Sequence, residues 1–355
     1  MKQICIQKFT VLMFVKTSLR VRKEKRKRKK VIEMSDKLSK EFKEMALKQK
    51  QSLPLEAKII LTKRRLREWY EYWEGDIYIS FSGGKDSTVL LDIARQMHSN
   101  IEAVFCDTGL EYPEIKEFVK TKENVTIIKP KINFKKVISK YGYPVISKEQ
   151  SHYISKVRNT KSEVIKNKHL NGINKDGSKS QFVISKKWKY MIDAPFEISD
   201  KCCEVMKKAP FKEYEKRTGK KAIMGTMAQE SNLRKRRYLE QGCNAFERDR
   251  PISTPLAFWT EQDILKYIYI YKLMISKAYG DVVKETEVNL IESIETYRTT
   301  LCKRTGCIFC VYGCHLEKEP NRFQLLKKTH PKIHKYCMEE LEIKKVLDYM
   351  KLKSE

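Results

Sequence analysis

The sequence predicts an α/β fold: a doubly wound parallel sheet, with a helical segment before it and a cysteine-rich, helical region after it. The first observation is that short apolar runs alternate with helical patterns between residues 76 and 140. Alternation at these lengths is typical of parallel strands whose connecting helices cover both faces of a sheet. The second observation is the segment Ser-Phe-Ser-Gly-Gly-Lys-Asp-Ser at residues 80–87, directly after the first apolar run. Ligands of such sheets bind beyond the carboxyl ends of the strands, where this segment is expected to lie.

The elements follow in order along the chain. Residues 36–75 are charged and have the apolar spacing of helices. A strand at Asp76–Phe81 leads into the glycines, and the next helix carries an apolar stripe at i, i+3, i+4 and i+7. The stripe consists of Leu90, Ile93, Ala94 and Met97, and it is followed by an expected strand at Ile101–Cys106, a helix at Pro113–Thr121 and a strand at Val125–Lys129.

The second half of the chain is less regular. Residues 151–192 are polar and rich in lysine, and we expect an insertion that contains at least one helix. The sheet should resume at Lys221–Gly225. Thr260 precedes an acidic first turn and is a predicted N-cap. A closing helix is expected at about Ile333–Lys351. The resulting division is an arm at 1–35, a helical segment at 36–75, an α/β nucleotide-binding domain at 76–275 and a C-terminal region at 276–355.

The chain is strongly basic, with 74 Lys and Arg against 45 Asp and Glu in 355 residues, a net charge of +29. Ten of the basic residues lie between Lys16 and Lys30, where Glu24 is the only acid. Such a block is typical of a disordered arm that contacts nucleic acid. Alternatively, Met34 is the natural start and residues 1–33 are an upstream translation artefact. The remainder is basic in either case, which suits a polyanion or a nucleotide substrate.

The composition also bears on the compartment. No segment reaches the ~18 apolar residues of a membrane span. The apolar run Phe9–Val15 is short and precedes a basic stretch, which is the wrong order for a signal peptide. We therefore expect a cytoplasmic protein without a membrane partner. Its ten cysteines are then expected to be metal ligands or reactive thiols rather than disulfides.

The residues Ser82–Ser87, called the glycine turn below, have the chemistry of a phosphate site. Adjacent glycines let backbone N–H groups approach an anion, and the following helix N-terminus adds partial positive charge. Ser82 and Ser87 supply hydroxyl groups and Lys85 a point charge. The turn is not a Walker A loop, whose first glycine and four-residue spacer are missing. An ordinary Gly-Gly turn would explain the glycines but not the flanking Ser and Lys.

Ser-Gly-Gly-Lys-Asp-Ser resembles the PP-loop of N-type ATP pyrophosphatases and of the phosphoadenylyl-sulfate reductase family. Two further segments resemble motifs of that family in the same order. Phe105–Gly109, with Glu111 and Pro113 after it, is similar to the family's DTG segment. Residues 225–234 are similar to its G-x-x-x-x-E-S-x-x-R loop. The resemblance covers roughly residues 60–315 and implies an adenine nucleotide α-hydrolase-like fold.

The resemblance implies a nucleotide site and gives its residues. Lys85, Asp86 and Arg234 would be catalytic, and Arg234 would grip phosphate or sulfate because a guanidinium binds such anions in bidentate fashion. Asp107 would contact ribose or adenine or orient Mg²⁺, although it would alternatively cap the helix that begins at Pro113. The full nucleotide-binding set is Ser82, Gly83, Gly84, Lys85, Asp86, Ser87, Asp107, Gly109, Glu230, Ser231 and Arg234.

The cysteines resemble the CC…CxxC set that holds a [4Fe–4S] cluster in adenylyl-sulfate reductases. Thiolates are soft ligands that suit iron–sulfur or zinc. Three other arrangements remain open. Cys302 and Cys314 would complete a local C-x4-C-x2-C-x3-C set, Cys243 is another candidate ligand, and the CxxC with His330 and His334 would suit zinc. The favoured ligands are Cys202, Cys203, Cys307 and Cys310.

Two reactions fit the resemblance. In the first, ATP binds, a substrate oxygen attacks the α-phosphorus, and the adenylylated substrate then receives sulfur. Nucleic acid is one candidate for this substrate. In the second, a thiolate attacks the sulfur of an adenylyl-sulfate. The cysteine at 314, in Gly-Cys-His-Leu-Glu, matches the family's catalytic C-terminal motif only loosely. A cysteine desulfurase or a thioredoxin-type protein would supply sulfur or electrons. The non-enzymatic alternative is a nucleic-acid-binding protein with a zinc site.

Overall fold

The computed structural model describes residues 38–288 and 293–354. The basic block at 16–30 and the alternative start at Met34 therefore lie outside the described residues. No helix within the described part is long and apolar enough to cross a membrane.

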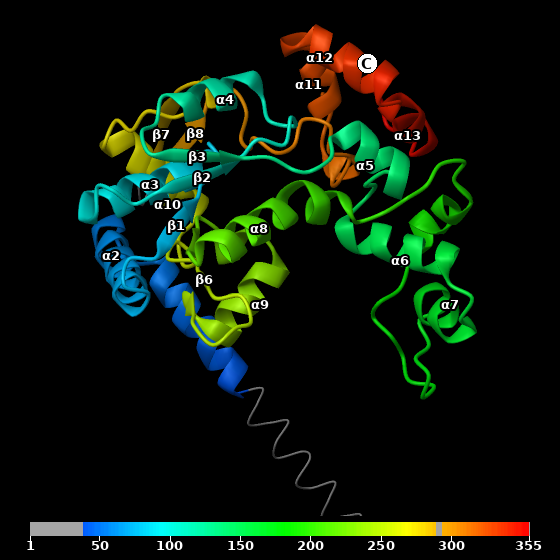
Figure 1. Cartoon of the computed structure of the whole chain (residues 1–355), viewed down its shortest axis with the longest axis horizontal. Helices are drawn as coiled ribbons and strands as arrows, with labels where there is room; N and C mark the ends of the chain where they lie inside the picture. Colours follow the sequence, from blue (N-terminus) through cyan, green and yellow to red (C-terminus); the bar gives the residue numbers. More distant parts are fainter. Residues whose placement is uncertain (1–37, 289–292, 355) are drawn as a thin grey trace, which may run out of the picture.

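A six-stranded sheet with the order β3-β2-β1-β4-β6-β5 forms the centre of the fold (Figure 1). Every neighbouring pair is parallel except β5 with β6. The strands are β1 Ile77–Ser80, β2 Ala103–Cys106, β3 Val125–Ile128, β4 Lys221–Met224, β5 Asn244–Ala245 and β6 Ile252–Ser253. The connections from β1 and β4 run to opposite sides, so a ligand crevice is expected beyond the carboxyl ends of these two strands. This architecture confirms the predicted fold class.

One face of the sheet is covered by a large apolar core that includes α2 Leu55–Tyr72, α3 Lys85–Met97, α4 Pro113–Lys120 and α10 Glu261–Ile270. The side chain of the predicted N-cap Thr260 accepts from Asp263 N at the start of α10. On the opposite face, α8 Ala209–Thr218 packs through Tyr214 against Tyr78 and Val104. The site is thus supported by a sheet that is buried on both faces.

A second core lies beside the sheet and joins segments that are far apart in the sequence. It includes α5 Phe134–Tyr141, α6 Lys148–Asn159, α11 Arg322–Thr329 and α13 Ile343–Tyr349. Figure 1 shows α11 and α13, in orange and red, beside α5. The predicted insertion contributes α6 and, on the outer side, α7 Glu163–Leu170.

The structure differs from the sequence prediction at the closing helix and in the strands after β4. The expected closing helix at 333–351 is interrupted: α12 Pro331–Lys335 and a π-turn at Tyr336–Glu340 precede α13, and Glu342 has a φ of 50°. A left-handed residue cannot continue a helix, and the break lets Leu341 and Ile343 both be buried. The hairpin of β7 Val282–Val288 and β8 Ser293–Thr299 was not predicted, because its first strand lacks an alternating apolar pattern.

Candidate nucleotide site and cysteine quartet

The glycine turn follows β1 and leads into α3, as its sequence predicts. Gly83 has a φ of +70°, and a Cβ at this position would lie 2.8 Å from Ile115 Cγ2. Only glycine fits both conditions. The hydroxyls of Ser82 and Ser87 are 3.0 Å apart, and Ser87 Oγ also donates to Gly84 O. The turn is therefore a tight, hydroxyl-rich loop at a helix N-terminus, which is an arrangement that suits an anion.

Lys85 is held inside this site, with its side chain only 3% exposed. Its Nζ lies 3.3 Å from Glu261 Oε1 and 3.5 Å from Asp86 Oδ1, and it donates to Lys303 O. Burial alone would lower the pKa of Lys85, but Asp86, Tyr279 and Glu261 outweigh it and raise the pKa. Lys85 is therefore a fixed positive charge at neutral pH.

Asp86 has the opposite environment for a carboxyl group. Burial raises its pKa, and Lys85 only partly offsets this effect. Its Oδ1 is buried and makes no hydrogen bond. A buried oxygen of this kind has the donor chemistry that Mg²⁺ prefers. The catalytic role expected of Asp86 stays a prediction.

The segment after β2 forms a compact turn. Asp107 Oδ1 accepts from Gly109 N and pairs with Lys116 Nζ at 2.6 Å. Burial opposes the charged form of Asp107, but Lys116 and the Gly109 N–H outweigh burial and lower its pKa. The N-cap of α4 is Tyr112, without a side-chain cap, so the alternative in which Asp107 caps this helix is wrong. Glu111 instead accepts from Thr108 N and Thr108 Oγ1.

The segment after β4 also lies at the glycine turn. A Cβ on Gly225 would lie 3.0 Å from Asp86 O, so the two loops are in close contact. Glu230 accepts from Met227 N and forms an ion pair with Arg234. Ser231 is the N-cap of α9 Asn232–Gln241 and accepts from Arg234 N. Glu230 and Ser231 thus order the loop that presents Arg234, whose side chain is 40% exposed.

Three residues that sequence reasoning missed complete the surroundings of the turn. Tyr279 accepts from Lys85 N at 3.2 Å and shares a hydrogen bond with Thr305. Glu261, in the first turn of α10, pairs with Lys85. No local motif marks these residues, because 176 or more positions separate them from Lys85 and only the folded chain joins them.

The four cysteines that the sequence favours, called the cysteine quartet below, come together although about 100 positions separate the pairs. Burial raises the pKa of Cys202, and Cys203, Cys307 and Cys310 raise it further. Burial likewise raises the pKa of Cys310 to about 12, with contributions from Cys307 and Cys203. Cys202 is therefore within electrostatic range of the other three thiols.

The quartet lies next to the turn that follows β2. Ile308, inside the CxxC, donates from its N to Leu110 O at 2.8 Å. Lys207 lies between the two features: burial opposes its charge, but Cys307, Glu111 and Cys203 outweigh this and raise its pKa. The positive charge of Lys207 is therefore close both to the turn after β2 and to the thiols.

The alternative ligands lie in other surroundings. Cys302 donates to Ala278 O beside Lys85. Cys314 is 1% exposed and is influenced by Glu317 and Arg322. Cys243 lies near Arg65 and Lys50. Cys302 and Cys243 therefore lie apart from the quartet, whereas Cys314 is in the same core as Cys202 and shares Arg322 with Cys310.

The histidines of the zinc alternative are occupied elsewhere. His330 Nε2 is 2.9 Å from Glu114 Oε1, and the buried His334 is 3.0 Å from Ser354 O through Nε2. Within the described residues, no three His, Cys, Asp or Glu side chains are arranged to hold one metal ion. The Cys-Cys-His-His set is therefore not assembled in this structure.

The sequence of the chain is similar to those of known proteins. The sequence profile of the phosphoadenosine phosphosulfate reductase domain matches residues 76–182 and 148–312. An adenosine 5′-phosphosulfate reductase of Geobacillus kaustophilus is 26% identical over 206 residues, 56% of this chain and 66% of that protein. An uncharacterized protein of Methanocaldococcus jannaschii is 32% identical over 122 residues, 32% of this chain and 29% of that protein.

The match with solved structures is weaker. A phosphoadenylyl-sulfate reductase from Candida auris, solved as a phosphate complex, aligns with 64% of this chain and 91% of its own, at 14% identity and a TM-score of 0.36. A TM-score this low carries no argument about function. The chain spans just under two thirds of the Geobacillus reductase and less than a third of the archaeal protein.

Proposed function

The chain belongs to the phosphoadenosine phosphosulfate reductase family, and from this premise we propose that it is an enzyme that binds an adenine nucleotide at the glycine turn and uses it in sulfur chemistry. The observation that carries the proposal is the meeting of the glycine turn, the fixed charge of Lys85 and the loops after β2 and β4 at the switch point of the sheet. Family relationship supplies the adenine nucleotide, and the local chemistry supplies the anion site.

The reaction we favour uses ATP. Ser82, Ser87 and the backbone N–H groups of the turn bind the β- and γ-phosphates, and Lys85 neutralises their charge. A substrate oxygen attacks the α-phosphorus: a new P–O bond forms, the bond to the bridging oxygen breaks, and pyrophosphate leaves. Asp86 and Asp107 would hold Mg²⁺, which supplies further positive charge. Arg234 binds the anionic end of the substrate from the loop after β4.

The cysteine quartet fits a [4Fe–4S] cluster by its donor chemistry. Four thiols within electrostatic range of one another, one buried and three half-buried, with Lys207 influencing them, offer soft anionic ligands and a compensating cation. A cluster of four irons is larger than a single metal ion, so its four thiolate ligands lie further apart than the ligands of one ion do. When bound, the cluster would take part in sulfur or electron transfer beside the nucleotide.

Adenylyl-sulfate reduction is the second candidate, and two observations favour it. The Geobacillus relative is an adenosine 5′-phosphosulfate reductase, and the thiol of Cys302 lies beside Lys85. In this reaction a thiolate attacks the sulfur, an S–S bond forms, the S–O bond breaks, and the nucleotide leaves. Burial raises the pKa of Cys302 to about 11, although Lys85 opposes this effect. A thiol that is mostly protonated is a poor nucleophile, which is why we favour ATP.

The test is an anaerobic incubation with labelled ATP and, separately, with labelled adenylyl-sulfates. We expect pyrophosphate from ATP once an acceptor is present. Lys85→Ala and Arg234→Ala should weaken nucleotide binding by about 1–3 kcal/mol, the range for charged hydrogen bonds. Release of sulfite that is lost in Cys302→Ser and kept in Cys314→Ser would select the reductase instead. Unchanged nucleotide affinity in both Ala variants would contradict the site.

A further inference from the structure

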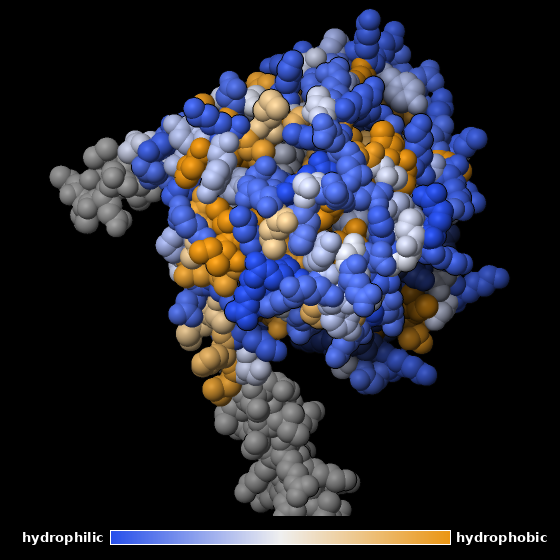
Figure 2. Space-filling model, turned by 60° about the vertical axis from the view of Figure 1, so that its left-hand side comes forward, coloured by the Kyte–Doolittle hydropathy of each residue, from blue (hydrophilic) through white to orange (hydrophobic). Residues whose placement is uncertain are grey.

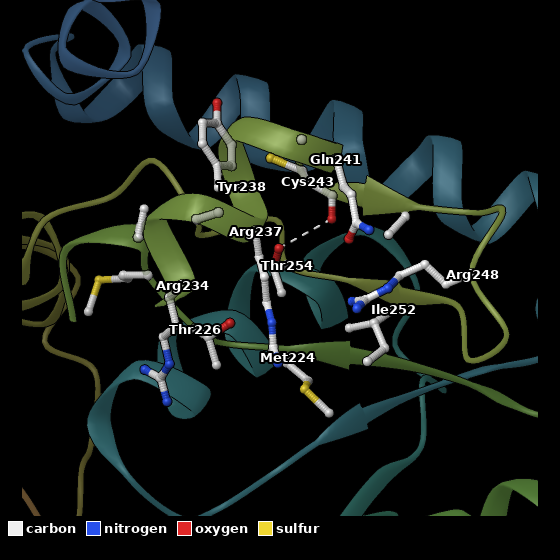
Figure 3. Close-up of a pocket in the computed structure, with 15 residues that line it drawn as sticks. Met224, Thr226, Arg234, Arg237, Tyr238, Gln241, Cys243, Arg248, Ile252 and Thr254 are labelled. Atoms are coloured by element: carbon white, nitrogen blue, oxygen red, sulfur yellow. Dashed lines mark hydrogen bonds between the residues drawn. The ribbon is translucent and has the colours of Figure 1, made fainter. Parts of the chain in front are cut away.

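A cavity of about 210 Å³ lies beneath α9, at the edge of the sheet formed by β4, β5 and β6 (Figure 3). Its lining comes from these elements and from the loop after β4, and includes no residue of the glycine turn or of residues 107–111. Figure 3 shows Arg234 and Arg237 descending from α9 and Arg248 entering from the β5–β6 connection. We call this space the arginine cavity.

Two of the three arginines are unneutralised. Arg234 is paired with Glu230. Within the described residues, by contrast, no ion pair joins a carboxylate to Arg237 or Arg248, and both side chains are exposed. Arg236, on the same helix, lies outside the cavity and pairs with Glu240. Two free guanidinium groups at one opening are suited to a phosphate, which each can bind in bidentate fashion.

The size of the cavity indicates that it takes only part of a ligand. Pockets that enclose a whole small molecule commonly measure about 300–1,000 Å³. The cavity's lining includes the apolar residues Met224, Ile252 and Ala257. It therefore fits one phosphate with its sugar, while the rest of the ligand continues over the surface.

The surface next to the cavity is basic. α9 carries four consecutive cations, Arg234–Arg237, and has no buried residue. Lys50 donates to the Tyr238 hydroxyl. Hydrophilic residues cover much of the forward face in Figure 2. Such a surface attracts a polyanion over several phosphates.

We propose that the arginine cavity binds a backbone phosphate of a polynucleotide, which is the acceptor of the reaction proposed above. That the polynucleotide is the acceptor rests on the proposed function, whereas its binding is inferred from the cavity alone. The loop that lines the cavity contacts the glycine turn through Gly225 and Asp86 O. A polynucleotide held by Arg237 and Arg248 would therefore pass beside the bound nucleotide.

The experiment measures binding of fluorescein-labelled dT20 and U20 to the full chain by anisotropy, across a salt series and without nucleotide. We expect Arg237→Ala/Arg248→Ala to weaken binding about tenfold or more and to reduce the slope of log K against log salt by about 1, because one phosphate contact is lost. Arg236→Ala removes the same charge from the same helix outside the cavity and should stay within about twofold of wild type. A loss in Arg236→Ala as large as the loss in the double variant would overturn the proposal.

A second measurement keeps the claim local, since other basic parts of the chain also attract oligonucleotides. Bound dT20 should protect Arg237 and Arg248, but not Arg236, from phenylglyoxal, as read by peptide mass spectrometry. Protection of none of them, or displacement of dT20 by millimolar ATP or pyrophosphate, would overturn a separate site. Lys85→Ala should keep dT20 affinity while losing pyrophosphate release, so failure of this inference and failure of the proposed function give different results.

Discussion

At the scale of single residues, the site is organised by a few charges whose neighbours fix their state. Lys85 stays protonated because carboxylates surround it, and Asp86 has a raised pKa because burial outweighs its lysine neighbour. Both side chains belong to one dipeptide at the start of α3. The backbone of the glycine turn directs one toward Glu261 and Lys303 O and leaves the other with an unbonded oxygen.

Gly83 is the residue on which the shape of the turn depends. Replacing it by Ala should destabilise the protein by about 2–4 kcal/mol, because Ala is strained at a φ of +70° and its Cβ would overlap Ile115 and Val119. Gly177→Ala, with a φ of +77° and no atom within 4 Å, isolates the strain and should cost about 1 kcal/mol. Urea unfolding measures both. Equal effects would show that the close contact with α4 does not matter.

The sequence predicts which residues are candidates for the site, but it does not predict the contacts that these residues make. Asp107, Glu230 and Ser231 were predicted to face the nucleotide, and in the structure they bind Lys116, Arg234 and nearby backbone. A motif records which residue types recur at a spacing, but partners such as Lys116 lie on the next helix and depend on how that helix packs. Whether these groups exchange partners for a nucleotide stays a prediction.

At the scale of elements, a buried ion pair connects the N-terminal helices to the site. Lys58 on α2 is 2.6 Å from Asp263 on α10, with side chains 2% and 13% exposed. Asp263 also accepts from Thr260 N in the capping box, and Glu261 in the same turn pairs with Lys85. α2 thus fixes the helix start that supports the PP-loop lysine.

Lys58→Met should destabilise the protein by about 3 kcal/mol, because it leaves the Asp263 charge without its buried partner. Adding Asp263→Asn to Lys58→Met should recover part of the loss, since no unpaired charge then remains. Thermal unfolding of the two single variants and the double variant gives the coupling. Additive losses would mean that the two side chains do not interact.

The acid stability of the sheet edge depends on Glu102. It accepts from Tyr214 at 2.6 Å, from Lys220 and from Thr126, which joins β2, β3 and α8. Burial raises its pKa, but these donors outweigh burial and lower it. A pKa lower in the folded than in the unfolded state stabilises the protein above the ordinary Glu pKa of about 4.3, and this stabilisation is lost as the pH falls through the folded pKa.

Glu102→Gln should therefore lower the unfolding free energy at pH 7, and the difference from wild type should shrink below about pH 4.3. Unfolding in urea at pH 7, 5 and 3 measures this difference. Glu117→Gln, an exposed change on α4, serves as the control and should show no such convergence. A difference that grows toward acid would contradict the assignment.

The elements that the sequence missed are those with the weakest local signal. Strands β1 to β4 lie within about two residues of their predicted bounds, because each is an apolar run between turn residues. β5 and β6 have two residues each, too few for any periodicity, and β7 is held mainly by its pairing with β8. Hairpins of this kind are determined by cross-strand contacts rather than by a pattern along one strand.

At the scale of the whole molecule, the cysteines join parts of the chain that the sheet leaves separate. Cys202 and Cys203 precede the π-turn Glu204–Lys208 that leads into α8, while the CxxC lies in a loop before α11. The second core contains residues from both regions. Sequence reasoning favoured this quartet from a resemblance. It had no means of anticipating that Leu110, after β2, would anchor the CxxC loop.

A bound cluster would therefore hold the second core together as well as serve chemistry, because binding that occurs only in the folded state adds to its stability. Protein purified anaerobically should absorb near ~400 nm and contain about four iron and four sulfide per chain. Cys202→Ser or Cys307→Ser should remove most of the iron and lower the Tm. Cys337→Ser, in the same core but outside the quartet, should keep the iron. Colourless protein with zinc, or full iron in the Cys307→Ser variant, would contradict the cluster and return the quartet to a structural role.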